Sequence, residues 1–244
     1  MDSNYKEIAR LMVDLKPCVA LTGAGISAES GIPTFRSKGG LWEKYDPMVY
    51  ASIKAFREDP SKYWTIRGEF IRNYDTYQPN NAHLALAELE EMGIVQHVIT
   101  QNIDGLHKKA GSRNVTEIHG SLRETYCLQC GKEFIAPHLP DGMPPYCGCG
   151  GVLKPNTVLF GEQLPEGALE TAYHESAACK LMLVIGTSAV VQPVASLPVL
   201  AQQKGAKIVE VNIERAFPGA DLVVAEKAGV GLSGILEEIK KIVA

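Results

Sequence analysis

The sequence has no long apolar run and no basic cluster. None of its hydrophobic stretches approaches the ~20 residues that cross a bilayer. Its first residues, Met-Asp-Ser-Asn, do not show the charged-then-apolar pattern of a signal peptide. We therefore expect a cytoplasmic protein that does not enter a membrane.

Positive charge is also limited. Lys and Arg number 24 against 28 Asp and Glu, for a net charge of -4, and no run of five basic residues occurs. Binding to nucleic acid or to an anionic membrane needs clustered cations that neutralise phosphates. We therefore expect no nucleic-acid partner. The 244 residues, 45% of them hydrophobic, are enough for one large domain or a large and a small one.

Cysteine is scarce, with six residues in the chain, and four of them form two close pairs. Cys127-x-x-Cys130 and Cys147-x-Cys149 are separated by sixteen residues. Four thiolates on two tight turns suit a tetrahedral Zn²⁺ that has no open position for chemistry. We therefore expect one structural zinc in the Pro- and Gly-rich segment 121–151. Two disulfides are the alternative, which a cytoplasmic compartment disfavours.

Strands and helices alternate along most of the chain, which predicts an α/β fold with a doubly wound, Rossmann-like parallel sheet. We expect strands at 18–21, 94–100, 115–119, 157–160, 181–186, 207–212 and 221–224. We expect helices at 3–15, 80–92, 104–110, 166–178, 193–204 and 232–242. The Rossmann-like domain would comprise 1–40, 79–120 and 152–244. The aromatic-rich helical insertion 41–78 and the zinc-binding insertion 121–151 would form a small domain.

The turn after the first expected strand has the spacing of a dinucleotide-binding turn. Residues 23–28, Gly-Ala-Gly-Ile-Ser-Ala, fit G-x-G-x-x-A. In that motif the glycines allow a tight bend and a close approach to a pyrophosphate. Small-residue turns after strands are common, so an ordinary turn stays open as the alternative. Phe35 and Arg36 follow in a glycine-containing loop, which is typical either of a movable cover or of a plain surface loop.

Polar residues also follow the next two strands. Gln101-Asn102-Ile103-Asp104 comes after Thr100, and His119-Gly120 ends the following strand. Open α/β sheets bind ligands at the carboxyl ends of their strands. The alternatives are a turn in which Asp104 caps the next helix, and a structural histidine.

The segment from Thr22 to Arg36 closely resembles the first motif of the sirtuin family of NAD-consuming protein deacylases, GAGxSxxSGIPxFR, at every fixed position. The tetrapeptide 101–104, the His119-Gly120 pair and the four Cys resemble later motifs, in family order. The resemblance implies an NAD-dependent protein-lysine deacetylase with one structural zinc. Its partners would be acetyl-lysine-bearing proteins.

The resemblance also implies roles for individual residues. His119 would be the general base, and Asn102 and Asp104 would hold the nicotinamide and its ribose. The residues expected at NAD are Gly23, Ala24, Gly25, Ala28, Phe35, Arg36, Gln101, Asn102, Ile103, Asp104, His119, Gly186, Thr187, Ser188, Asn212, Ile213, Lys227 and Ala228. The residues expected to pair with the substrate peptide are Val158, Leu159, Phe160, Gly161 and Glu162.

In the implied mechanism the acetyl-lysine carbonyl oxygen attacks C1′ of the nicotinamide ribose, and the acetyl group ends on ADP-ribose. Three alternatives share features of the sequence. A hydride-transferring dehydrogenase would share NAD and the zinc lobe, and a zinc-ribbon nucleic-acid module would share the four Cys. An ADP-ribosyltransferase would share the first chemical step.

The acyl group can also be predicted. Sirtuins that remove succinyl or malonyl groups typically carry a Tyr-x-x-Arg pair, and these positions fall here on Arg67 and Phe70. The phenol is missing and an apolar ring replaces the guanidinium, so we expect acetyl groups to be removed better than succinyl groups.

Overall fold

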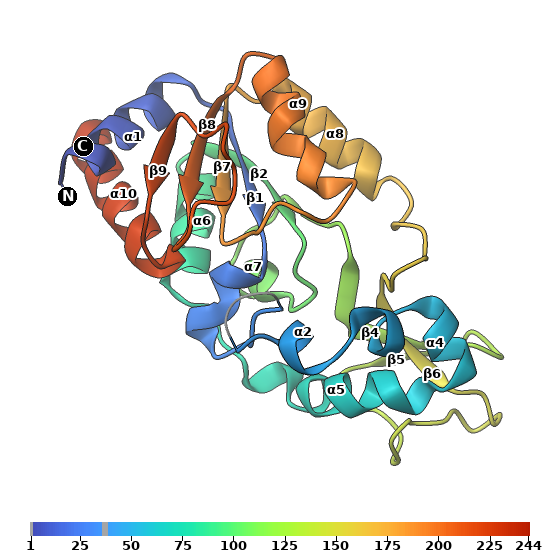
Figure 1. The fold of residues 1–244 in the computed structure, drawn as a ribbon. Coiled ribbons are helices and arrows are strands. Elements are labelled where there is room, and N and C mark those ends of the chain that lie inside the picture. Colours follow the sequence, from blue (N-terminus) through green and yellow to red (C-terminus); the bar gives the residue numbers. More distant parts are fainter. Residues whose placement is uncertain (1, 36–38) are drawn as a thin grey trace.

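The computed structural model describes residues 2–35 and 39–244. It contains a large lobe, built on a sheet between two layers of helices, and a smaller lobe of short helices and a separate sheet (Figure 1). The two chain ends lie close together on the large lobe. No helix of the described part is long and apolar enough to cross a membrane.

The large sheet has six parallel strands in the order β3-β2-β1-β7-β8-β9. They are β1 (Cys18–Thr22), β2 (Val95–Thr100), β3 (Val115–Glu117), β7 (Leu181–Ile185), β8 (Lys207–Val211) and β9 (Leu222–Val224). Strands β1 and β7 are buried along their whole length, as continuous apolar runs predict for central parallel strands. The strand order changes direction at this pair, because β2 and β3 follow on one side of β1 and β8 and β9 on the other side of β7. Open α/β sheets bind ligands at the carboxyl ends of the strands at such a point.

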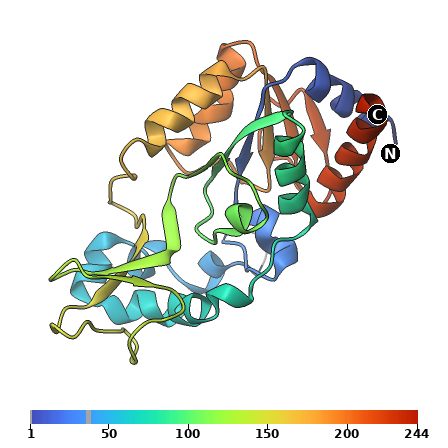
Figure 2. The ribbon, with the colours of Figure 1, turned by 180° about the vertical axis from the view of Figure 1, so that it is seen from behind.

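Helices cover both faces of this sheet. Figures 1 and 2 show α1 (Asp2–Asp14), α6 (Asn81–Glu91) and α10 (Ala228–Val243) on one face and α8 (Ala168–Ala178) and α9 (Leu197–Gln203) on the other. Each layer has its own buried apolar cluster against the strands. The doubly wound fold expected from the alternating pattern is thereby confirmed.

Helix α6 begins and ends where local chemistry requires. The Asn80 side chain accepts a hydrogen bond from the Ala82 N–H, and the His83 ring accepts one from the Asn80 N–H. The helix ends before Gly93, whose φ of 69° favours glycine. This cap fixes the His83 ring in the interior, where its other nitrogen faces the Ser27 hydroxyl.

The small lobe combines the two segments that interrupt the large one. Its helices are α2 (Leu41–Lys44), α3 (Pro47–Tyr50), α4 (Ile53–Glu58) and α5 (Pro60–Arg72), and its antiparallel sheet has the order β5-β4-β6. The strands are β4 (Gly120–Cys127), β5 (Glu133–Ile135) and β6 (Leu153–Thr157). Trp64 of α5 is fully buried and donates its indole N–H to the Leu153 carbonyl at 3.1 Å. One core therefore joins the helical and the cysteine-bearing segments.

The remaining elements are short: η1 (Ala24–Ser30), η2 (Tyr74–Thr76), η3 (Val194–Ser196) and α7 (Leu106–Lys109). Two expectations from the sequence were wrong. The strand expected at 157–160 is β6, which ends at Thr157 and belongs to the small sheet, because Lys154 and Leu153 pair with β4. The last helix begins at Ala228 and not at residue 232. Its first turn was missed because Gly229 and Gly231 have low helix propensity and no apolar side chain; both face close neighbours where a side chain would not fit.

Candidate functional site

A cavity of roughly 1150 Å³ opens where the two lobes meet, at the carboxyl ends of the large sheet. Of the residues expected at NAD, it is lined by Gly23, Ala24, Gly25, Ala28, Phe35, Gln101, Asn102, Ile103, His119, Gly186, Thr187, Ser188, Asn212 and Ile213. The five residues 158–162 line it as well, on the side of the small lobe. The structure thus brings together segments that are up to 190 residues apart in the sequence (213 − 23).

Some expected residues lie elsewhere. Lys227 and Ala228 are outside the lining, at the start of α10. Arg36 lies outside the described residues. Arg67, expected beside the acyl group, lines the cavity as well. The cavity also has walls that the sequence analysis missed, among them Thr34 and residues 191–193 and 214–216. Residues 214–216 directly follow Ile213 and residues 191–193 come shortly after Ser188, and this proximity in the sequence was the only available signal.

The turn after β1 is shaped by contact with the turn after β7. The Gly25 N–H donates to the Gly186 carbonyl at 2.7 Å. A Cβ on Gly25 would lie 2.7 Å from the Gly186 Cα, and a Cβ on Gly186, whose φ is 56°, would lie 2.4 Å from the Ile26 nitrogen. Glycine is therefore required on both sides. The bare backbone leaves a cradle of the kind that a dinucleotide's phosphates occupy, and the cavity volume suits NAD.

The chain continues from this turn into the 3₁₀ helix η1 and not into an α-helix. Gly31, with φ at 82°, ends it and its N–H bonds back to the Ala28 carbonyl. Pro33, two residues later, also disfavours a longer helix.

A buried polar network lies below the cavity floor. The Ser27 hydroxyl donates to the Asp104 carboxylate at 2.7 Å and accepts from the Asn102 amide at 3.0 Å. The other Asp104 oxygen accepts the Leu106 N–H at 3.0 Å. Asp104 therefore caps the entry into α7, and through Ser27 it is linked to Asn102, which lines the cavity; Asp104 itself is not among the lining residues. Burial raises the pKa of Asp104, and its hydrogen bonds oppose that rise.

Two buried histidines, His83 and His107, lie next to this network, and the sequence analysis gave no role to either. The His83 and His107 rings lie 4.9 Å apart, edge to face. The His83 Nε2 is 3.4 Å from the Ser27 hydroxyl, and the His107 Nε2 is 3.0 Å from the Thr22 hydroxyl. Burial lowers the pKa of His83 to about 4 and the pKa of His107 well below its usual value. Both rings are neutral near pH 7.

His119 is half-buried and lines the cavity beside residues 158–160. Its Nδ1 lies 3.1 Å from the Gln101 carbonyl oxygen. A carbonyl can only accept, so Nδ1 carries the proton and Nε2 keeps the lone pair that a general base needs. Gly120 follows with φ at 78°, and a Cβ there would lie 2.1 Å from the Asn156 carbonyl oxygen. Glycine at position 120 is therefore a geometric requirement of the β4–β6 contact.

Hydrogen bonds also fix the part of the cavity wall at the ends of β7 and β8. The Asn212 amide donates to the Thr187 carbonyl at 3.0 Å, and the Gln101 amide donates to the Thr187 hydroxyl at 2.8 Å. The fully buried Glu210 accepts from the backbone N–H groups of Ala216 and Phe217. These bonds fix the loop 213–216 against the end of β8.

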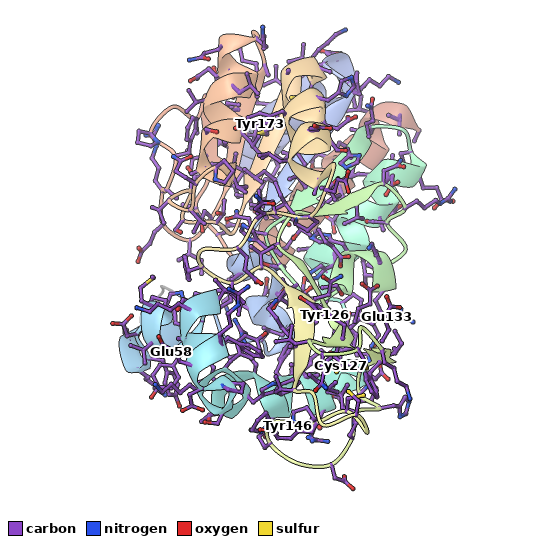
Figure 3. The ribbon with its side chains drawn as sticks, turned by 90° about the vertical axis from the view of Figure 1, so that its right-hand side faces the viewer. Glu58, Tyr126, Cys127, Glu133, Tyr146 and Tyr173 are labelled. Atoms are coloured by element: carbon purple, nitrogen blue, oxygen red, sulfur yellow. The ribbon has the colours of Figure 1, made fainter. Side chains whose placement is uncertain are left out.

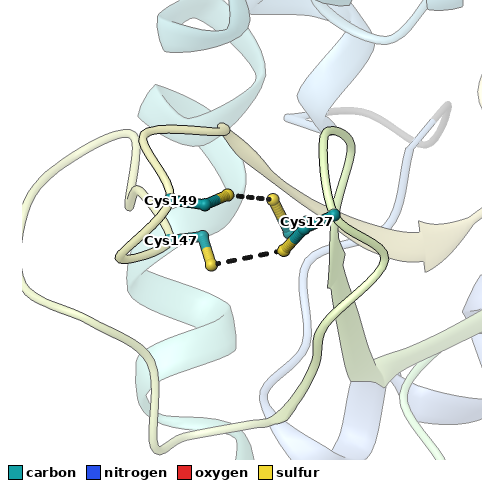
Figure 4. Close-up of side chains that lie close together, drawn as sticks. Cys127, Cys147 and Cys149 are labelled. Atoms are coloured by element: carbon teal, nitrogen blue, oxygen red, sulfur yellow. Dashed lines mark hydrogen bonds between the residues drawn. The ribbon is translucent and has the colours of Figure 1, made fainter.

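The four expected metal ligands converge in the small lobe. The sulfurs of Cys127, Cys130, Cys147 and Cys149 all lie within 4.8 Å of one another. Two of the separations are 3.5 and 3.7 Å (Figure 4). These distances exceed a disulfide bond and suit four thiolates around a tetrahedral Zn²⁺ with ~2.3 Å bonds.

None of the four cysteines lines the cavity. Figure 3 shows Cys127 and Tyr146 together in the small lobe, far from Tyr173 on α8. The site is therefore suited to hold the lobe together and not to take part in chemistry at the cavity.

The sequence profile of the Sir2 family matches residues 23–193. The chain belongs to the Sir2 family. It is 45% identical to the NAD-dependent protein deacylase 2 of Pyrobaculum aerophilum over 96% of this chain and 95% of that one. It is 41% identical to the NAD-dependent protein deacetylase of Saccharolobus solfataricus, over 97% and 98%.

Solved structures of Sir2 proteins have the same fold. A Sir2 homologue in complex with NAD is 43% identical and superposes with a TM-score of 0.89 over 98% of this chain and 95% of that one. A Sir2 complex with a p53 peptide and NAD⁺ is 36% identical, with a TM-score of 0.87 over 98% and 99%. This member of the Sir2 family therefore shares its whole architecture with proteins that bind both NAD and a peptide.

Proposed function

We propose that this protein is an NAD-dependent protein-lysine deacetylase that transfers the acetyl group of lysine to ADP-ribose and releases nicotinamide. One arrangement carries the proposal: a histidine with a basic Nε2, a buried carboxylate-amide network and a peptide-pairing segment meet in a single cavity. The names of the relatives support the activity. A Sir2 complex with deacetylated p53 peptide and 3′-O-acetyl ADP ribose supports the acetyl acceptor.

NAD would supply an electrophilic C1′ carbon with nicotinamide as the leaving group. Asn102, held by Ser27, would orient the nicotinamide ribose, and Asp104 would keep Asn102 and the α7 entry in place. The acetyl oxygen is a weak nucleophile, so its alignment with C1′ supplies much of the rate. The glycine turn and the residues 186–188 and 212–213 would hold the phosphates and the adenosine.

His119 would act in the next step. Its Nε2 would remove the proton from a ribose hydroxyl, which would then attack the carbon of the former acetyl group. Water would complete the reaction, with the lysine amine as the leaving group and the acetyl group left on ADP-ribose. The Nδ1 contact with Gln101 fixes the ring orientation and the tautomer for this transfer.

The substrate protein would present acetyl-lysine from an extended segment that pairs with residues 158–162. The Val158 carbonyl and the Gly161 N–H have no hydrogen-bond partner within the described part of the chain. They would pair with the substrate backbone. Acetyl-lysine-bearing proteins are thus the proposed partners, met in the cytoplasm.

We assign the parts of the chain as follows. Residues 1–40, 79–120 and 152–244 would form the NAD-binding domain, and the insertions 41–78 and 121–151 would form the small domain that carries zinc.

The test is direct. The protein is incubated with NAD and an acetyl-lysine peptide, and the products are identified by mass spectrometry. Nicotinamide and O-acetyl-ADP-ribose in equal amounts are expected. Formation of NADH, seen by its absorbance, would instead indicate a dehydrogenase, and ADP-ribose attached to protein would indicate a transferase.

A further inference from the structure

Lys154 is a buried cation directly behind the peptide-pairing segment. It lies on β6, its side chain is 3% exposed, and its ammonium contacts three oxygens. These are the Thr157 carbonyl at 2.9 Å, a Glu162 carboxylate oxygen at 3.0 Å and the Pro155 carbonyl at 3.3 Å. A buried ammonium is costly unless all its donors are used. Lys154 meets this condition with three acceptors.

Glu162 extends the same arrangement across the segment. The carboxylate oxygen that contacts Lys154 also accepts the Leu159 N–H at 2.8 Å, and the Glu162 N–H donates to the Leu159 carbonyl at 2.9 Å. Lys154 therefore joins Thr157, the residue before the segment, to Glu162, its last residue.

The segment between these two anchors is tied to the catalytic histidine. The Val158 N–H donates to the His119 carbonyl at 2.9 Å. Phe160 exchanges backbone hydrogen bonds with Ala51 and Ile53 of the helical insertion, at 2.9 and 3.0 Å. Residues 158–160 belong to no strand of either sheet, so these few bonds and the two anchors define their extended shape.

We propose that Lys154 is a positioning residue for the substrate peptide: by joining Glu162 to the carbonyls of Thr157 and Pro155, it holds residues 158–161 extended and in register with His119. The inference rests on the proposed function and deepens it. A cation with several donors is needed here, and one ammonium can donate to a carboxylate and two carbonyls at once. An apolar residue of similar length would leave Glu162 without its cation.

The test compares two ligands that differ only in length. One is an acetyl-lysine peptide of about ten residues, and the other is a single acetyl-lysine with blocked ends, which has no flanking backbone to pair with residues 158–161. Lys154→Met should weaken peptide binding, measured by calorimetry, at least tenfold and raise KM for the peptide similarly. The kcat for the peptide, the KM for NAD and the kcat/KM for the single residue should stay within about twofold.

Lys207→Met is the matched control, since Lys207 also forms an ion pair, with Asp221 at 2.7 Å, away from the cavity. It should leave both ligands unaffected. Lys154→Arg should restore most of the peptide affinity, because a guanidinium also offers several donors. Thermal unfolding of each variant is measured alongside. If Lys154→Met does not fold, Lys154→Gln, whose amide still donates to a carbonyl but cannot neutralise Glu162, should show the same length-dependent loss.

Equal losses on both ligands, or wild-type peptide affinity in Lys154→Met, would overturn the inference. A wild-type protein that binds the peptide but forms no O-acetyl-ADP-ribose would contradict the proposed function alone, because the affinity comparison still decides the role of Lys154. A wild-type protein that does not bind the peptide would overturn both.

Discussion

His119 has one ring nitrogen committed to the Gln101 carbonyl, and this single bond defines the role of the other nitrogen. A base that acts after nicotinamide has left should be dispensable for the first step. We predict that His119→Ala lowers net deacetylation by roughly 10²–10⁴-fold. It should still catalyse exchange of labelled nicotinamide into NAD, in the presence of acetyl-peptide. Asp104→Ala should lose both activities because Asp104 supports Asn102. Near-normal deacetylation by His119→Ala would show that another group is the base.

His83 makes the stability of the protein depend on pH. Its pKa falls to about 4 in the folded state, so the unfolded chain binds more protons between pH 4 and 6.5 and stability is lost as the pH falls through this range. From pH 7 to pH 5 we predict a loss of about 2 kcal/mol from this residue. His107 acts in the same direction, and Asp104, whose pKa is raised, acts in the opposite one.

His83→Gln isolates this contribution. Urea unfolding at both pH values should show a smaller loss of stability in the variant than in the wild type, by about 2 kcal/mol. The same pH dependence in both proteins would mean that His83 is already protonated in the folded state at pH 5.

Single residues also show how far the sequence could be interpreted. The glycines, His119 and the four cysteines stand in short motifs, and the structure gives each motif a local reason. His83 and Lys154 stand in no motif. Each lies between two apolar neighbours in its helix or strand, and the sequence does not show the tertiary contacts with Ser27 and Glu162.

At the scale of elements, the turns after β1 and β7 function as one unit because their backbones touch. We predict that Gly25→Ala lowers NAD affinity roughly tenfold or more, about 1.4 kcal/mol, since its Cβ must displace Gly186 from the cradle. Gly148→Ala is the control: its Cβ would meet no atom within 4 Å and lies outside the cavity. Calorimetric titration with NAD measures both. Wild-type affinity in Gly25→Ala would show that the turn can shift without cost.

The sequence analysis predicted the helices and strands whose positions follow from the pattern of buried apolar residues. The continuous apolar strands of the large sheet and the periodic helices α1 and α6 lie close to their expected positions. The segment 157–160 was misassigned because its apolar pattern reflects a cavity wall and not a sheet. The 3₁₀ form of η1 also has no periodic signal in seven residues.

At the scale of the whole molecule, the small lobe depends on its cysteines. Cys127 and Cys147 belong to its buried core together with Trp64 and Leu122. We predict one zinc per chain by metal analysis. Cys127→Ala should lose the metal and lower Tm by ~10 °C or more, since small cysteine sites bind zinc with about 10–16 kcal/mol. Cys18→Ala is the control, as that thiol is buried in the large lobe. Zinc-free fresh protein, or disulfides among the four cysteines, would contradict the prediction.

The contact between the lobes also determines which acyl group fits. Of the two positions that would bind an acyl carboxylate, Phe70 stacks on Tyr77 at 4.6 Å and does not line the cavity. Arg67 does line it, but its guanidinium carbon lies 4.9 Å from the centre of the Phe35 ring. The Tyr63 hydroxyl is paired with Thr157 at 3.1 Å. A succinyl carboxylate would therefore meet one cation, and a phenol whose hydroxyl already has a partner.

We predict that kcat/KM is at least tenfold higher for acetyl-lysine than for succinyl-lysine in the same peptide, because an anion buried with too few donors costs a few kcal/mol. Any residual activity on succinyl-lysine should depend on Arg67, so Arg67→Met should lower it more than the activity on acetyl-lysine. Lys62→Met, a change on the same helix outside the cavity, should leave the ratio unchanged. A wild-type preference for succinyl-lysine would show that Arg67 alone is a sufficient partner for the carboxylate.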